Sequence, residues 1–487
     1  MSKTNWEYCI TIVLRRGVRM ADCISGLLYI ASIGVSCSFF VENYIVTLIP
    51  EQNKISIDKL KNWCNQSYND EEFEWLSGVT SDNRPIYLAR RSQGGYTLGT
   101  GIHIGAVNFH CPIIIVNHEL SNENHNGFFG IEFIGDDINL IYPPDKALNY
   151  TIKPPAINYN NPENYTDKYN IDLNNECFRL IKTIDVHNRI NIGTIVNLPQ
   201  NIQSKLRLEF DEEKSFQDLL KYYRYVSNLL TFLKRISNNE FEVKLLTRNN
   251  IEGKTYYKDF AEVSFYKGDS TNDSERLTVR DVLKIDDLGD NIVSLFELLN
   301  RDQTAPNLLF LPNSVNDRNI IKYGQIIDIC SAIEVEYKNG RQPKENDKLK
   351  HEAINLAKNL INCVNSSGVE DKLKNKAISI IGSTIKNFSP SLKDKIRFLY
   401  GLYKDELNNI CKMHHWLTEY SEKDFYSRIK LFTEMRHSIA HQKMSWNDGQ
   451  DIYTHIILLI YFSIFNRAGI SSDIAQKCIS NGFHNIF

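Results

Sequence analysis

A chain of 487 residues is too long for one ordinary hydrophobic core, so two or three domains are expected. Charged residues make up 24% of the chain and apolar residues 42%, which is ordinary for a soluble globular protein. The formal net charge of −3 excludes a generally basic surface of the kind that coats nucleic acid, although it is compatible with a local basic patch.

The ten cysteines are spread along the chain and form no C-x-x-C pair. This distribution argues against a disulfide framework or a zinc cluster. It favours reduced, mostly buried thiols in a cytoplasmic protein.

An uncharged segment near the N-terminus, "CISGLLYIASIGVSCSFFV" (23–41), allows two interpretations. It is just long enough to span a bilayer, and Arg15, Arg16 and Arg19 precede it, as the positive-inside rule requires. Its serines and glycines lower its hydrophobicity, however, and fit turn and pleat positions in a sheet. The segment is therefore predicted as a pair of buried strands, with membrane insertion as the alternative.

The rest of the first 300 residues contains many short β-branched or aromatic runs separated by Gly, Asn and Asp. A long loop is predicted at 142–170, where Pro, Asn and Tyr occur without periodicity, and a helix at 215–236, where apolar residues recur at helical spacing. The other predicted elements are strands at 42–50, 77–91 (two strands with a turn at 81–83), 111–118, 127–135, 175–186, 204–210, 241–247 and 256–266, and short helices at 278–285 and 291–300.

A junction at 301–317 separates this part from a helical part, in which Ser389-Pro390 is a helix-start signal. The predicted helices are 318–338, 347–365, 370–386, 391–410, 422–442 and 450–467. Six helices at this spacing are expected to form an up-and-down bundle. The sequence therefore predicts an α+β, multidomain fold, with a β-rich N-terminal domain (1–315) followed by an all-α helical bundle (316–487).

The candidate site lies in "EMRHSIAHQK" (434–443), near the end of one predicted helix. The apolar stripe of this helix is formed by Phe425, Ile429, Phe432 and Ile439. Arg436 lies on or beside that stripe, so it is expected to meet a partner, a ligand or another subunit, because an unpaired buried charge is costly. His437 and His441 share one helix face, whereas Arg436 and His441 are about 140° apart.

Three interpretations of this pattern are open. His437 and His441 have zinc-site spacing, but Ser438 stands where a zinc hydrolase has its glutamate, and Arg436 opposes a dication. The histidines are also compatible with a solvated surface helix. The third interpretation is phosphodiester chemistry, in which a guanidinium holds the phosphate and an imidazole moves protons. These groups suffice for metal-free RNA cleavage by the ribose 2′-OH.

The arrangement of Arg436, His437 and His441 late in a helical bundle resembles the R-x4-H motif of HEPN-domain ribonucleases, with His437 where Asn is common. The segment "IKYGQIIDICSAIEVEY" (321–337) resembles the leading helix of the ApeA-like branch, with Glu334 in its Ala-x-Glu-type segment. Segments 24–40 and 75–90 resemble parts of the ApeA N-terminal β domain. The resemblance covers nearly the whole chain and is most specific at 434–441.

The resemblance implies a bacterial anti-phage protein of the abortive-infection kind, with a HEPN endoribonuclease domain that needs no metal or other cofactor. Two HEPN domains would pair as a homodimer or a higher homo-oligomer, with the motifs facing each other across the two-fold axis. His441 would act on the 2′-OH or the leaving oxygen, Arg436 would stabilise the phosphate, and His437 would position it. Transfer RNA is one candidate target by analogy. The N-terminal domain would sense a phage-derived trigger, and no membrane partner is expected.

Three further groups are weaker candidates. His414 and His415 precede the motif helix and either line the same cleft or are solvated. Glu334 either pairs with Arg436 or lies on a helix surface. A run of basic residues is either an RNA track or a solvated face: Lys372, Lys374, Lys376, Lys393, Lys395 and Arg397.

Two rival functions accompany the ribonuclease prediction. The first is a non-catalytic HEPN module for dimerisation and for binding RNA or protein, in which the motif is structural. The second is a metal-dependent hydrolase that uses His437 and His441.

Overall fold

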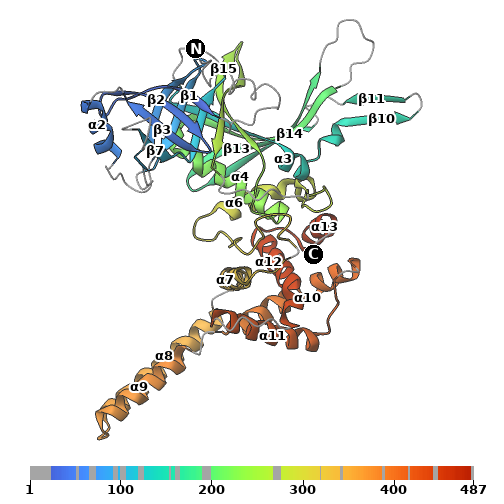
Figure 1. Ribbon diagram of the computed structural model, residues 1–487. Coiled ribbons are helices and arrows are strands. Elements are labelled where there is room, and N and C mark those ends of the chain that lie inside the picture. Colours follow the sequence, from blue (N-terminus) through green and yellow to red (C-terminus); the bar gives the residue numbers. More distant parts are fainter. Residues whose placement is uncertain are drawn as a thin grey trace.

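The computed structural model describes residues 23–50, 54–64, 73–91, 97–98, 106–118, 125–152, 155–159, 165–188, 199–266, 276–318, 320–340, 344–386, 390–414, 417–441 and 448–483. A β-rich N-terminal region is followed by a helical C-terminal region (Figure 1). This arrangement confirms the predicted α+β, multidomain fold class.

The strands of the described ranges are β1 (Ile24–Ile30), β2 (Val35–Glu42), β3 (Ile45–Pro50), β4 (Glu74–Thr80), β5 (Pro85–Arg90), β6 (Thr97–Leu98), β7 (Val107–His110), β8 (Ile113–Asn117), β9 (Gly127–Ile134), β10 (Leu148–Ile152), β11 (Pro155–Tyr159), β12 (Asp167–Leu173), β13 (Glu176–Asn188), β14 (Pro199–Ser215), β15 (Glu242–Ile251) and β16 (Lys254–Phe265). Fourteen of them form one sheet in the order β12-β13-β14-β9-β15-β16-β8-β5-β4-β1-β2-β3-β7-β6. The neighbours are antiparallel, and β10 and β11 form a separate hairpin.

The segment 23–41 forms the hairpin of β1 and β2, which confirms the prediction of two strands. Alternate side chains face opposite sides of the sheet, so Leu28 and Phe39 are buried while Leu27 is exposed. Within the described ranges, no helix combines the length and the apolar character that crossing a bilayer requires.

Helix α2 (Lys54–Cys64) covers a core formed by the first strands of the sheet. Trp63 is fully buried there, and the Arg90 guanidinium lies 3.9 Å from the centroid of its ring. Arg90 also forms an ion pair with Glu74 at 2.8 Å, so the buried charge is compensated.

The later strands pack against α3 (Asp136–Ile141), α4 (Leu219–Lys234) and α6 (Ile292–Asn300), with the short α5 (Ile285–Leu288) beside them. Aromatic side chains of α4 take part in this packing. The Tyr223 ring stacks on Phe265 of β16 with centroids 3.9 Å apart, and Phe210 and Tyr222 have ring centroids 4.5 Å apart.

The helices of the C-terminal region are α7 (Tyr323–Gly340), α8 (Lys344–Ser366), α9 (Asp371–Lys386), α10 (Leu392–Met413), α11 (Glu422–Ala440), α12 (Tyr453–Arg467) and α13 (Ser472–Gly482). The first six match the predicted helices, and α13 was missed. Helix α10 begins two residues after Pro390, and its N-cap Ser391 forms a capping box with Asp394.

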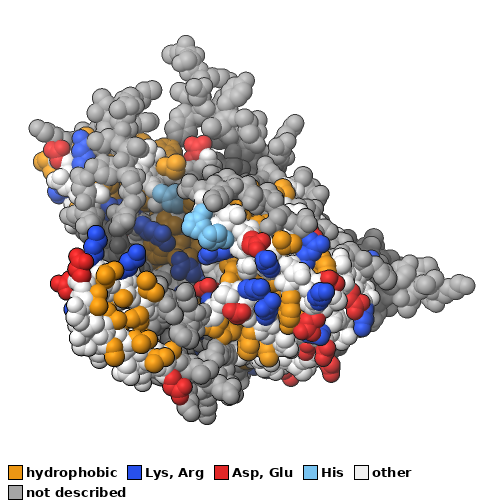
Figure 2. Space-filling model, turned by 90° about the horizontal axis from the view of Figure 1, so that it is seen from below, with side chains coloured by type: hydrophobic (Ala, Val, Ile, Leu, Met, Phe, Trp, Pro, Cys, Tyr) orange, Lys and Arg blue, Asp and Glu red, His pale blue; other side chains and the backbone are white. Residues whose placement is uncertain are grey.

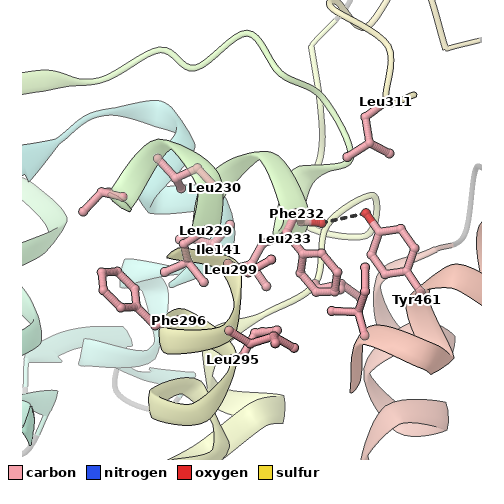
Figure 3. Packing of buried hydrophobic residues seen from close by; sticks show 14 of the residues in the cluster. Ile141, Leu229, Leu230, Phe232, Leu233, Leu295, Phe296, Leu299, Leu311 and Tyr461 are labelled. Carbon is pink, nitrogen blue, oxygen red and sulfur yellow. Dashed lines mark hydrogen bonds between the residues drawn. The ribbon is translucent and has the colours of Figure 1, made fainter. Parts of the chain in front are cut away.

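Helix α12 joins the two regions through one continuous core. It is apolar on all sides and buried on all sides. Tyr461 stacks on Phe232 of α4 with centroids 4.5 Å apart, and its hydroxyl donates a 2.8 Å hydrogen bond to the Phe232 carbonyl (Figure 3). The β-rich and helical regions are therefore packed together, not merely tethered.

Helices α8 and α9 pack against each other and project from the helical region as an arm (Figure 1). Their spans agree with the prediction, but they do not join an up-and-down bundle as expected. Leu356 and Leu360 of α8 and Leu373 and Ile380 of α9 stay exposed, because the arm has no neighbour in the described part of the chain on that side.

Two other predictions differ from the structure. The expected loop at 142–170 contains β10, β11 and the start of β12, since Pro155 begins a strand without having to donate to its partner. The segment expected to be helical at 278–285 is a turn that leads into α5, and Asp281 accepts from the backbone N–H of Thr278.

Candidate functional site

Helix α11 carries the R-x4-H-like pattern, and its N-terminus is fixed by a cap. Ser421 is the N-cap and accepts from the Asp424 N–H. The apolar stripe is buried as predicted, with one further member, and consists of Phe425, Ile429, Phe432, Met435 and Ile439. Packing of this stripe against the bundle therefore sets the direction of each polar side chain on α11.

His437 and His441 lie together at the C-terminal end of α11. Their ring centroids are 4.3 Å apart with an interplanar angle of 61°, and both residues are exposed. His441 is the C-cap residue, and its backbone N–H donates to the carbonyl oxygens of His437 at 3.1 Å and Ser438 at 3.2 Å. Two imidazoles thus face solvent side by side on a backbone that the helix end fixes.

Arg436 points to another side of the helix, toward α7. Burial raises the pKa of the Cys330 thiol on α7 to about 12, and the nearby Arg436 guanidinium opposes this rise. Among the residues that the structure describes, the Nε of Arg436 is buried without a hydrogen-bond acceptor. In the described residues no contact joins Arg436 to His441, in keeping with the angle of about 140° that their spacing gives. One chain therefore presents the arginine and the histidines on separate sides of α11.

Glu334 does not meet Arg436 in the described structure. Its carboxylate forms an ion pair with Lys395 at 3.1 Å, and its side chain is more than half exposed. Of the two interpretations of Glu334, the position on a helix surface is therefore the one that the structure contains, with Lys395 of α10 as its partner.

His414 lies at the other end of α11 from the histidine pair. It caps the end of α10, is buried, and precedes the first turn of α11. The 19 residues of α11 rise about 27 Å, so His414 and His441 stand on opposite ends of this helix. His415 lies outside the described residues.

The predicted basic run is divided between two helices. Lys372, Lys374 and Lys376 lie on the arm, where Lys374 is 3.7 Å from Asp371. Lys393, Lys395 and Arg397 lie on α10 in the bundle. The structure therefore does not assemble these six residues into one track.

Two members of this run, Lys393 and Arg397, belong to a basic cluster where α10 meets α11. An open pocket of about 550 Å³, here called the α10–α11 pocket, is lined by Lys393, Arg397, Glu422, Lys423, Tyr426, Ser427 and Lys430. Sequence reasoning did not predict three members of this cluster on α11, namely Lys423, Tyr426 and Lys430. The spacing that places them on the helix face of His437 could have indicated them.

A metal site at His437 and His441 would need further ligand side chains nearby. Among the residues that the structure describes, no group of three or more His, Cys, Asp or Glu side chains is arranged to hold a metal ion. His437 and His441 thus form a pair without a third such ligand in that part of the chain.

Helix α11 thus carries three features suited to a chemical role. They are an exposed imidazole pair, a half-buried guanidinium, and a basic pocket toward the start of the helix. Comparison of the chain with protein-family models, with curated proteins and with solved structures gave no match.

Proposed function

We propose that the chain is a metal-independent endoribonuclease in which Arg436, His437 and His441 act on a phosphodiester of RNA. The observation that carries the proposal is the end of α11, where two exposed imidazoles lie 4.3 Å apart and one turn of helix also holds Arg436. Imidazoles exchange protons near neutral pH, and a guanidinium stabilises an anionic phosphate.

The reaction would use the ribose 2′-OH as nucleophile. One imidazole takes the 2′-OH proton while the 2′-oxygen attacks phosphorus, and the bond from phosphorus to the 5′-oxygen breaks. The leaving 5′-oxygen receives a proton from the other imidazole. The products are a 2′,3′-cyclic phosphate and a free 5′-OH, with no change in oxidation state.

Arg436 would stabilise the charge on the phosphate from a second copy of the chain. Its guanidinium lies about 140° around α11 from His441, so it does not serve the same phosphate as the histidines of its own chain without rearrangement. A two-fold pairing of α11 helices, as the HEPN resemblance implies, brings these groups to one site.

The cellular role of this proposal is anti-phage defence by abortive infection in the cytoplasm. It rests on the resemblance of the chain to ApeA-like HEPN proteins. The N-terminal β-rich region (1–315) would then be the sensor or restraint of a HEPN domain (316–487), and transfer RNA one candidate substrate.

A second candidate is a non-catalytic HEPN-like binding module. The position of Arg436 beside the buried Cys330 thiol favours it, because the arginine then has a structural role within one chain. In that case the motif stabilises the contact of α7 with α11.

Mapping of RNA ends separates the two candidates. RNA from cells that express the wild type, Arg436→Ala, His437→Ala or His441→Ala is sequenced at its 2′,3′-cyclic phosphate ends, with and without phage. Glu434→Gln, an exposed change one turn before the histidines, is the matched control. New cyclic ends are expected in the wild type and the control and not in the Arg436 or His441 variants. Full cleavage by the His441 variant contradicts the proposal. Cleavage by the purified protein that EDTA abolishes favours a metal enzyme.

A further inference from the structure

The α10–α11 pocket is built from basic side chains around an aromatic ring. Lys393 and Arg397 come from α10, and Lys423 and Lys430 come from α11. Glu422 is the acidic residue in the lining, and it is neutralised by Lys404 of α10 at 2.8 Å. The pocket therefore has an excess of positive charge in a chain whose formal net charge is −3.

Arg397 has spare hydrogen-bonding capacity in this pocket. Its guanidinium lies 4.7 Å from the centroid of the Tyr426 ring, and its Nε is buried without an acceptor in the described part of the chain. Stacking on a tyrosine holds the guanidinium plane in one orientation while its other N–H groups remain available. Such an arginine is suited to bind an oxyanion by two parallel hydrogen bonds.

Two acidic residues near the pocket are already engaged. Asp394 closes the capping box of α10 with Ser391, and the Ser391 hydroxyl is the main cause that lowers the Asp394 pKa. Glu434 lies 3.9 Å from Lys430, a distance typical of a weak exposed pair. Neither carboxylate is in the pocket lining, so the charge excess in the pocket persists.

The pocket and the histidine pair lie on one face of α11. Lys423, Lys430 and His437 follow each other at intervals of seven residues, which places them within about 40° around the helix, and His441 falls within the same arc. Along the helix axis His437 is about 10 Å and His441 about 16 Å beyond Lys430. Figure 2 shows histidine side chains beside Lys and Arg side chains at a hollow on the underside of the molecule.

We infer that the α10–α11 pocket binds the phosphate backbone of single-stranded RNA and aligns the strand along α11 toward His437 and His441. Lys393, Arg397, Lys423 and Lys430 contact phosphates, and a base stacks at Tyr426. Successive phosphates of a stacked strand are separated by about 3.4 Å along its axis, so the span from Lys430 to the histidines covers about three to five nucleotides. This inference rests on the proposed ribonuclease function.

The test measures binding with RNA that cannot be cleaved. A fluorescein-labelled 12-nucleotide 2′-O-methyl RNA lacks the attacking hydroxyl, so its fluorescence anisotropy reports binding to the intact wild-type protein. The pocket variant carries Ala at Lys393, Arg397, Lys423 and Lys430. At 150 mM NaCl its Kd is expected to rise at least tenfold. The slope of log K against log salt is expected to fall by about 3, since each of four phosphates contributes about 0.7.

A matched control removes the same charge elsewhere. It carries Ala at Lys358, Lys372, Lys376 and Lys412, which are exposed residues of α8, α9 and α10. Its Kd is expected to stay within about twofold of the wild type. If the control and the pocket variant lose affinity equally, RNA is held by general electrostatic attraction, and the inference is wrong.

Two smaller changes keep the test valid if the pocket variant does not fold. Lys423→Gln with Lys430→Gln changes two exposed residues, and about half of the loss in salt slope is expected. Tyr426→Leu is expected to weaken binding about tenfold, while Tyr426→Phe keeps the ring and the affinity. Unchanged Kd values in both tests overturn the inference.

The result of the pocket binding test can be distinguished from the result of the cleavage test of the proposed function. If His441→Ala cleaves RNA normally and the pocket variant still loses affinity, the pocket is supported and the catalytic assignment fails. If the motif variants are inactive and the pocket variant binds like the wild type, only the pocket inference fails.

Discussion

A buried ion pair connects α7 with α12 in the core of the helical region. The Glu336 side chain is fully buried, and its Oε1 lies 2.5 Å from Nη1 of Arg467, whose side chain is 8% exposed. Ser463 also donates to Glu336 at 2.8 Å, and Arg467 donates to the carbonyl of Thr304. Removing the arginine leaves a carboxylate in an apolar core without its counterion.

We expect Arg467→Met to lower the free energy of unfolding by about 3–5 kcal/mol, the usual cost of breaking a buried pair on one side. The double variant with Glu336→Gln is expected to recover at least about 1.5 kcal/mol, since a neutral amide needs no counterion and keeps the hydrogen bond to Ser463. A coupling of this size distinguishes the loss of charge compensation from the loss of packing by Arg467.

The effect of pH follows from the direction of the pKa shift. Burial raises the pKa of Glu336 above its ordinary value, and Arg467 opposes this rise. A raised folded-state pKa contributes stability below the ordinary carboxyl pKa, and that contribution is lost as pH increases through the folded-state pKa. Without Arg467 the rise is larger, so Arg467→Met is expected to be more destabilising at pH 8 than at pH 5.

Urea unfolding followed by far-UV circular dichroism at both pH values measures these differences, provided that the m-values agree between variants. A loss below about 1 kcal/mol for Arg467→Met refutes the argument. So does a double variant that is no more stable than Arg467→Met, or a loss that is independent of pH.

Three further predictions concern stability. Gly449 lies in the 3-10 turn Asp448–Ile452 so close to α11 that an added Cβ would be 2.5 Å from the Phe432 backbone nitrogen. Gly449→Ala is therefore expected to lower the free energy of unfolding by about 1–3 kcal/mol, as measured by thermal unfolding. The control Gly401→Ala, with open space in α10, should be neutral or stabilising by up to about 1 kcal/mol. Equal effects of the two changes contradict this interpretation of the contact. Burial lowers the pKa of His455, so the folded state binds its proton more weakly, and stability present above the ordinary histidine pKa is lost as pH falls through the folded-state pKa. His455→Gln should flatten the decrease in urea midpoint between pH 7.5 and 5.5, and an unchanged slope argues against it. Tyr461→Phe removes the hydrogen bond to the Phe232 carbonyl and should lower the free energy of unfolding by about 1 kcal/mol in urea, while a neutral result means that the hydroxyl contributes nothing.

Local patterns predicted much of the fold. The alternation of side chains in 23–41 distinguishes strands from a membrane span, since Tyr29 is exposed between the buried Leu28 and Ile30. The turn at 81–83 was predicted by its residue types, and Asn83 has a φ of 64° there. The hairpin of β10 and β11 was missed because its prolines suggested a loop, although Pro155 needs no N–H at that edge.

Packing between helices was less accessible to sequence reasoning. The periodicity of α8 and α9 predicts apolar stripes but not which stripe finds a partner, so the arm was mistaken for part of a bundle. At the site, the sequence predicted the apolar stripe of α11 and the position of Arg436 beside it. It did not predict Cys330 as the contact of Arg436, or the meeting of Arg397 with Tyr426, because these pairs are far apart in the chain.

The packing contact between α4 and α12, here called the joint, determines whether the molecule stays together when its backbone is cut. Residues 301–317 contain no helix or strand, and Leu309 there is 75% exposed, so a protease can reach this connection. The cut leaves intact the stacking of Phe232 on Tyr461 and of Arg235 on Phe483. Each large side chain buried at the joint contributes about 1.5–3 kcal/mol. The two fragments are therefore expected to elute together as one non-covalent particle, and proteolysis at this point does not release the helical region.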